Sequence, residues 1–106
     1  MNDAAAAGVP ADVAAAVARL RARFLERAAG ERDDLQRWSA DLDGSRGLAR
    51  PLVHRIAGAA GTFGFARLSE VAKIAEDALI SGAPGRHAAI AELIAELDRA
   101  LCTAAT

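Results

Sequence analysis

The stretch HRIAGAAGTFGFARL, residues 54–68, joins a helical apolar pattern to a clear stop signal. Ile56 and Phe63 lie two helical turns apart, the spacing of one face of an α-helix. Gly64 then interrupts the pattern, as glycine commonly does just after a helix C-terminus. Because Leu68 opens a new apolar stripe, the stretch predicts two helices joined by a short connection around Gly64.

Helical periodicity continues on both sides of this stretch and predicts four amphipathic helices. Their expected ranges are 11–42, 48–63, 66–81 and 87–103. Gly30 lies inside the first range, where the stripe keeps its phase, so one long helix is expected although an interior glycine costs about 1 kcal/mol. A short turn at Gly30 is the alternative. The sequence DGS at 43–45 predicts the break before the second helix.

The apolar stripes define the positions expected in the core. In the first two helices these are Val13, Val17, Leu20, Phe24, Ala28, Leu35, Trp38 and Leu42, followed by Leu48, Leu52, Ile56, Ala59 and Phe63. Pro51 falls within the second helix. If that helix begins near residue 48, Pro51 occupies one of the first four positions, where a missing N–H costs no intrahelical hydrogen bond.

Composition favours an all-α protein. Of the 106 residues, 53% are hydrophobic and only 4% aromatic, and no alternating strand pattern occurs. Four amphipathic helices with short connections predict an antiparallel up-down four-helix bundle. A single domain is expected over residues 11–103, with a disordered or frayed tail at 1–10 and a second tail at 104–106.

Charge and cysteine content exclude several classes of function. The formal net charge is -1, which gives no electrostatic basis for binding nucleic acid or an anionic membrane. No apolar run approaches the roughly 20 residues that span a bilayer. Cys102 is the only cysteine, and no Cys or His pair has metal-ligand spacing, so no disulfide, zinc site or other metal is expected. These features predict a cytoplasmic protein, and a monomer is the simplest expectation for a complete bundle.

His54 is predicted to face solvent. At about 100° per residue it projects opposite the apolar stripe of the second helix. Apart from one arginine its neighbours on that outer face are small or compact: Gly47, Arg50, Pro51, Ala57, Gly58 and Gly61. Gly58 and Gly61 lower the stability of the helix and bring no gain in folding. Their presence therefore indicates that another molecule comes close to this face. An ordinary surface histidine, with glycines that serve helix packing, is the alternative.

An exposed imidazole can act as a nucleophile, a general base or a metal ligand. Catalysis by the bundle alone is disfavoured, because no Ser or Cys nucleophile neighbours His54 and a convex helix face does not enclose a substrate. A partner protein that brings its own chemistry to His54 fits better.

The fragment HRIAGAAGTFGFARL resembles the histidine phosphotransfer (HPt) domain, and is especially similar to the phosphoacceptor domain of chemotaxis histidine kinases. His54 takes the phosphoacceptor place. The other matching positions are Ile56, Gly58, Gly64 and Leu68. The resemblance covers residues 54–68 by motif and about 11–101 by helix pattern. It implies a phosphocarrier in which His54 accepts a phosphoryl group from a receiver-domain aspartate, or from a kinase, and passes it to another receiver aspartate.

The resemblance also implies roles for residues around His54. The family commonly has a lysine three residues after the histidine, where this chain has Ala57. Arg50 or Lys73 could supply the missing charge toward the phosphoryl oxygens, and solvating charges are the alternative for both. Ser69, Lys73 and Glu76 are expected on one shoulder of the third helix. Glu76 falls where the family places a glutamate that hydrogen-bonds the other ring nitrogen.

The expected docking surface for a receiver consists of small or apolar residues near His54. Its members are Pro51, Ala57, Gly58, Gly61, Gly64 and Phe65. Phe65 either packs on the turn or contacts the partner. Since the magnesium ion belongs to the receiver in this family, no cofactor of this chain is expected.

Three functions are compatible with these features. The first is a stand-alone phosphocarrier without kinase activity, because no nucleotide-binding segment is present. The second is a non-catalytic HPt-like module that binds a receiver without carrying phosphate, an alternative that the missing lysine keeps open. The third is a fragment of a larger chemotaxis-type or hybrid kinase.

Overall fold

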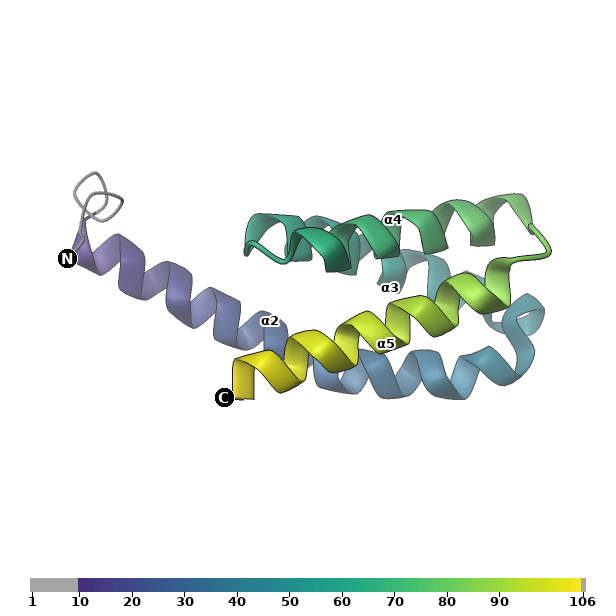
Figure 1. The fold of residues 1–106 in the computed structure, drawn as a ribbon, viewed down its shortest axis with the longest axis horizontal. Coiled ribbons are helices and arrows are strands. Elements are labelled where there is room, and N and C mark those ends of the chain that lie inside the picture. The colour runs from purple at the N-terminus through teal and green to yellow at the C-terminus, as the bar shows by residue number, and fades with distance from the viewer. Residues whose placement is uncertain (1–9, 106) are drawn as a thin grey trace.

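The structure, a computed structural model, describes residues 10–105. Over this range every regular element is helical (Figure 1). The elements are α2 (Ala11–Trp38), the 3-10 turn η1 (Ser39–Asp41), α3 (Leu42–Thr62), α4 (Ala66–Ser81) and α5 (Arg86–Ala105). The prediction of an all-α chain is therefore confirmed. The expected tail over residues 1–9, and Thr106, lie outside the described residues.

The break between the first two helices lies earlier than predicted. It falls at Ser39–Asp41, and DGS forms part of the first turn of α3. The carboxylate of Asp41 caps α3 by accepting a hydrogen bond from the Gly44 N–H at 3.1 Å. A Cβ at position 44 would lie 2.3 Å from Asp41 Oδ2, so a glycine is needed beneath this cap.

The early start of α3 also changes the setting of Pro51. With Leu42 as its first residue, α3 holds Pro51 in its interior rather than in its first turn. The expectation that this proline costs no hydrogen bond is therefore wrong, because a helix interior needs the N–H that proline lacks.

The predicted stops after α3 and α4 are confirmed. Gly64 has φ +85° and Gly82 has φ +67°, the left-handed conformation that glycine adopts most easily. The Phe65 N–H donates to the Ala60 carbonyl at 2.8 Å, and the Ala83 N–H donates to the Ala78 carbonyl at 3.1 Å. The first connection also has a bond from the Gly64 N–H to the Gly61 carbonyl and so forms a Schellman motif, whereas the Gly82 N–H donates to Ala78. In both cases carbonyls at the helix end are satisfied.

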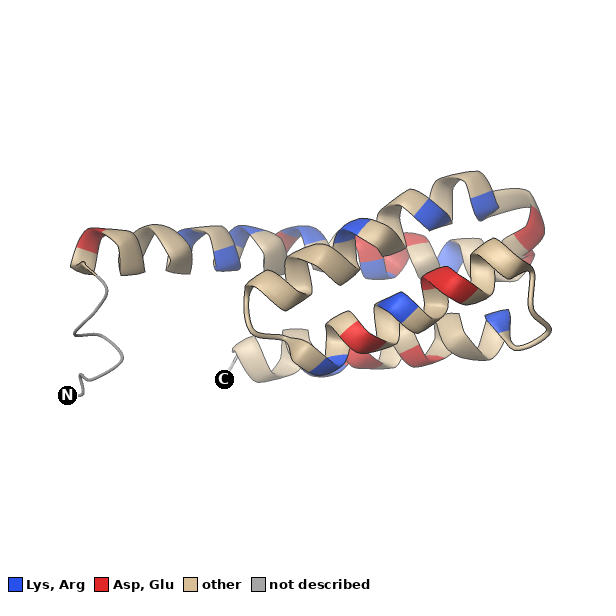
Figure 2. Cartoon of the chain, turned by 90° about the horizontal axis from the view of Figure 1, so that it is seen from above, with Lys and Arg blue, Asp and Glu red and all other residues tan. Residues whose placement is uncertain are grey.

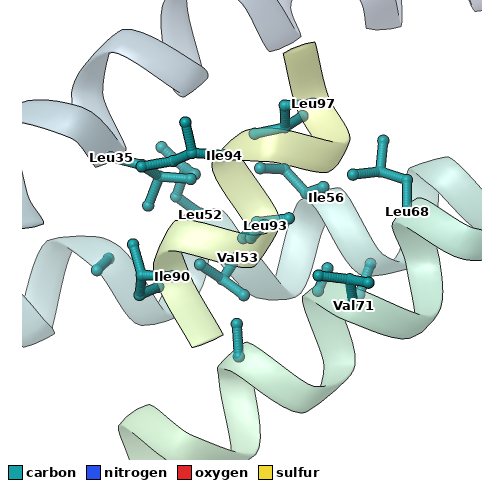
Figure 3. Close-up of a cluster of buried hydrophobic side chains, with 14 of the residues drawn as sticks. Leu35, Leu52, Val53, Ile56, Leu68, Val71, Ile90, Leu93, Ile94 and Leu97 are labelled. Atoms are coloured by element: carbon teal, nitrogen blue, oxygen red, sulfur yellow. The ribbon is translucent and has the colours of Figure 1, made fainter. Parts of the chain in front are cut away.

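The core lies where α3, α4, α5 and the second half of α2 meet (Figure 3). The fully buried large side chains are Phe24, Leu35, Leu42, Val53, Ile56, Leu79, Ile90, Leu93 and Leu97. The first half of α2 projects beyond the other helices (Figure 1). Val13, Val17 and Leu20 are therefore about half exposed, and their predicted place in the core is wrong.

The buried face of α3 is rotated relative to the prediction. Leu48 is 61% exposed, whereas Ala49, Val53 and Ala57 are buried beside Leu52 and Ile56. Trp38, Ala59 and Phe63 pack against the core but are only partly buried. This rotation decides which residues share the outer face with the histidine.

Candidate functional site

His54 and Glu76 form the centre of the candidate site. α3 presents the His54 side chain with 74% of its area exposed, and α4 places Glu76 beside it. The ring atom Nδ1 lies 2.8 Å from Glu76 Oε2. The side chain of Glu76 is only 22% exposed, so its carboxylate is held against the surface while the ring stands in solvent.

This contact determines which ring nitrogen is available for chemistry. An ionised carboxylate only accepts hydrogen bonds, so this contact requires the tautomer in which the Nδ1–H group donates a hydrogen bond to Glu76. In the neutral ring the other nitrogen, Nε2, then carries the lone pair. Nε2 makes no hydrogen bond within the described part of the chain. The arrangement presents an oriented, solvent-facing nucleophile.

The space around the ring is open on two sides. A Cβ at Gly58 would meet no atom of another described segment within 4 Å. On the other side Gly47, Arg50, Pro51 and Glu76 line a cavity of about 260 Å³. Apart from Arg50 and Glu76, the residues named around the ring are small or compact, so a second molecule can come close to His54.

Two residues predicted for the outer face are buried. Ala57 is only 4% exposed and belongs to the core, so it offers no surface to a partner. Ser69 is 6% exposed and donates a hydrogen bond to the Ala57 carbonyl instead of sharing a solvent-facing shoulder with Lys73 and Glu76. Both errors follow from the rotated buried faces of α3 and α4.

Arg50 and Lys73 are the free cations near the site. Both are exposed, and neither forms a hydrogen bond or ion pair with another residue that the structure describes. Arg50 lines the same cavity as Glu76. Arg55, in contrast, donates to Glu31 of α2 at 2.9 Å and is engaged in the fold.

Gly64 and Phe65 lie apart from the histidine, at the connection between α3 and α4. Eight residues of α3 follow His54 before the helix ends at Thr62, about 12 Å at 1.5 Å per residue. The Phe65 ring is 5.8 Å from that of Phe24, and the Arg21 guanidinium lies over it at 4.7 Å. Phe65 thus packs against α2 and stays partly exposed, so its predicted contact with a partner stays a prediction.

Sequence reasoning missed two polar contacts that join helices near the site. One is the buried hydrogen bond from Ser69 to Ala57, whose only signal was the small residue Gly61 opposite. The other is the pair of Glu31 and Arg55. Glu31 takes an apolar place in the stripe of the first helix and is 6% exposed, which could have indicated a buried acid in need of a partner.

Residues 10–105 contain neither a metal-binding cluster nor a membrane-spanning helix. They hold no group of three or more His, Cys, Asp or Glu side chains placed to bind a metal ion. No helix among them is both long and apolar enough to span a bilayer.

An exposed histidine oriented by a glutamate on a neighbouring helix is the site expected of a phosphoacceptor domain. The family model of the Hpt domain matches residues 19–104, so the chain belongs to the Hpt domain family. Hpt domains take part in histidine phosphotransfer within phosphorelays, where they interact with receiver domains. Searches of the curated proteins and of the solved structures found no match.

Proposed function

We propose that this protein is a phosphocarrier in which His54 Nε2 accepts a phosphoryl group from an aspartyl phosphate of a receiver domain, or from a kinase. It then passes the group to the aspartate of another receiver. The observation that carries the proposal is the 2.8 Å contact between Glu76 and the Nδ1 atom of a ring that is 74% exposed. Membership of the Hpt family supports it.

The transfer step follows from this geometry. The lone pair of Nε2 forms a bond to phosphorus as the bond from phosphorus to the aspartate oxygen breaks, and the aspartate leaves as a carboxylate. The Nδ1 proton remains on the ring, which therefore gains positive charge. The Glu76 carboxylate stabilises that charge through the same hydrogen bond.

Two cations of this chain and the receiver domain complete the site in this proposal. Arg50 and Lys73 are free to contact phosphoryl oxygens, in place of the lysine that the family commonly has at position 57. The magnesium ion and the acidic pocket belong to the receiver, and this chain contributes no cofactor. The helices act as an antiparallel up-down four-helix bundle, and the protein works as a cytoplasmic monomer.

One observation favours a second candidate, a module that binds a receiver without carrying phosphate. Position 57 holds a buried alanine, so no charge can reach the phosphate from there. In this case the exposed face around His54 would still dock a receiver, but the ring would remain unmodified.

A transfer experiment separates the two candidates. The protein is incubated with a phosphorylated receiver and magnesium and then examined for acid-labile, base-stable phosphate. His54→Gln should abolish the label, whereas His87→Gln should retain it, because His87 is the other of the two histidines and lies on α5. An unlabelled wild-type protein, or label that survives in His54→Gln, decides against the phosphocarrier.

A further inference from the structure

Ser69 forms a buried polar link between α3 and α4. Its hydroxyl donates to the Ala57 carbonyl at 2.7 Å, and the residue is 6% exposed. Neither residue forms a hydrogen bond with the histidine ring, whose partner is Glu76. A directional hydrogen bond of this kind fixes the position of one helix against the other more closely than apolar contact does.

Gly61 provides the space for this link. A Cβ at position 61 would lie 3.3 Å from Ser69 Oγ, closer than ordinary contact, whereas a Cβ at Gly58 would meet nothing within 4 Å. A methyl group at position 61 would push the Ser69 hydroxyl, and this shift would strain its 2.7 Å hydrogen bond to Ala57. The space at Gly61 therefore supports helix packing, the alternative to a role in the approach of a partner.

The link and the histidine site belong to the same helix pair. Ser69 and Glu76 are seven residues apart on α4, two turns and about 10 Å along one face. Ala57 and His54 are one turn apart on α3. A shift or rotation of α4 against α3 would therefore change the distance between Glu76 and His54.

The buried side chains of these two helices include large residues, such as Ile56 on α3 and Leu79 on α4, and a set of small ones. The small residues are Ala57 and Ala60 on α3 and Ala72 and Ala75 on α4. Methyl groups form shallow ridges, so this part of the contact restricts sliding of the helices less than a directional hydrogen bond does.

We propose that Ser69 and Gly61 are positioning residues, which set the register of α4 on α3 and so hold Glu76 in hydrogen-bond contact with His54 Nδ1. The proposal deepens the proposed function, since it assigns how the nucleophile is oriented. Its first test uses the free, unphosphorylated protein and therefore does not depend on phosphotransfer.

The first test measures the tautomer of His54 by the ¹⁵N chemical shifts of its ring. In the wild type the Nδ1–H form should dominate. Ser69→Ala and Gly61→Ala should each raise the share of the Nε2–H form and weaken the coupling to Glu76. Gly30→Ala is the control for an added methyl group, because a Cβ at position 30 would meet nothing within 4 Å and Gly30 lies on α2, outside this helix pair. The ring spectrum of His54 in this control should be that of the wild type.

The second test measures the rate of phosphorylation by a phosphorylated receiver. Ser69→Ala and Gly61→Ala should each slow it by about two- to tenfold, because small misplacements of a reacting group lower its rate. Ser45→Ala is the control, since that hydroxyl bonds to Trp38 and Asp41 carbonyls away from His54, and its rate should match the wild type.

The double variant gives the sharpest outcome. Without Ser69 Oγ, the nearest atom to a Cβ at position 61 is the Cβ of residue 69 at 3.8 Å, an ordinary contact. Gly61→Ala should therefore add nothing further in a Ser69→Ala background. Unchanged ring spectra in both folded single variants, or additive effects in the double, would overturn the positioning role. If the protein is never phosphorylated but the Ser69 and Gly61 variants change the ring spectrum as expected, the phosphocarrier proposal fails and the positioning role stands.

Discussion

Glu76 differs from the other surface acids in how it is held. Its side chain is 22% exposed and its carboxylate contacts a ring atom of another helix at 2.8 Å, whereas Asp33, Asp43 and Glu70 are well over half exposed. A partly buried carboxylate loses less entropy when it forms a hydrogen bond, because its position is already restricted. Glu76 is thus suited to orient an otherwise mobile ring.

Replacing Glu76 tests this role directly. Glu76→Ala should slow phosphorylation of His54 by about tenfold or more, because the ring loses its orienting partner and the stabilisation of its developing charge. Glu76→Gln should fall between Ala and the wild type, since an amide oxygen still accepts from Nδ1–H without a full charge. Far-UV circular dichroism should show an intact fold for both. Rates equal to the wild type would remove Glu76 from the site.

For single residues, the sequence predicted the exposure of His54 correctly but did not predict on which side of its helix each small residue lies. The position of His54 opposite the apolar stripe predicted its exposure, and the resemblance indicated Glu76. Ala57 was misplaced because alanine fits either a core or a surface, so only the exact phase of the helix decides its side. The Ser69 contact depends on the approach of two helices, which no local pattern encodes.

Among the elements, α3 combines the site with the least regular helix interior. Pro51 stands one turn before His54 and removes an N–H that the Gly47 carbonyl would otherwise accept. Both Gly47 and Pro51 line the cavity beside Glu76. The helix is thus locally weakened at the place where the partner is proposed to dock.

Pro51→Ala should stabilise the protein by about 2 kcal/mol. Alanine restores the backbone hydrogen bond and removes the clash between the proline ring and the preceding turn, and both changes favour the folded state. The greater freedom of the unfolded chain offsets part of this gain. Urea unfolding followed by circular dichroism measures the change. Leu48→Ala, at an exposed site of the same helix, should change stability by less than about 0.5 kcal/mol. A lower unfolding midpoint for Pro51→Ala would contradict this account.

The boundary between α2 and α3 shows what sequence patterns leave open. The segment SADLDGS, residues 39–45, contains two aspartates, and either could begin a helix. Asp41 is the cap because Gly44 lets its carboxylate reach the backbone N–H. The pattern thus identified a break in the correct region and misplaced it by about one turn.

α2 and α3 are also joined by a buried charge. The Glu31 side chain is 8% exposed and accepts from Arg55 at 2.9 Å, with Arg27 further away at 3.9 Å. Arg55 is itself 59% exposed, so solvent screens its share of the interaction. The pair is therefore worth less than a fully buried one.

Arg55→Ala should lower the free energy of unfolding by about 1–2 kcal/mol, because it leaves the Glu31 carboxylate without its close partner. Arg37→Ala provides the comparison, since Arg37 pairs with Asp34 at the surface and its loss should cost less than about 0.5 kcal/mol. Denaturant unfolding of the two variants measures the difference. Equal costs would show that the Glu31 contact contributes no more than a surface pair.

On the scale of the whole molecule, stability is expected to be unevenly distributed. The longest extent is 48 Å and the other two are 22 and 20 Å (Figure 2). α2, with 28 residues, is longer than α3, α4 or α5, and its N-terminal part extends past the other helices (Figure 1). An amphipathic stripe alone could not reveal this, because periodicity predicts which face is apolar and not whether a partner covers it.

Hydrogen exchange and core substitutions should reveal this unevenness. Amides of residues 14–20 should exchange far faster than those of α3 and α5, since their helix lacks tertiary support. Val17→Ser or Leu20→Ser should change the free energy of unfolding by less than about 0.5 kcal/mol. Leu35→Ala and Leu97→Ala, at fully buried positions, should each cost about 2–5 kcal/mol. Equal protection along α2, or a large cost for Leu20→Ser, would mean that the projecting half is packed in solution against a surface outside the described fold.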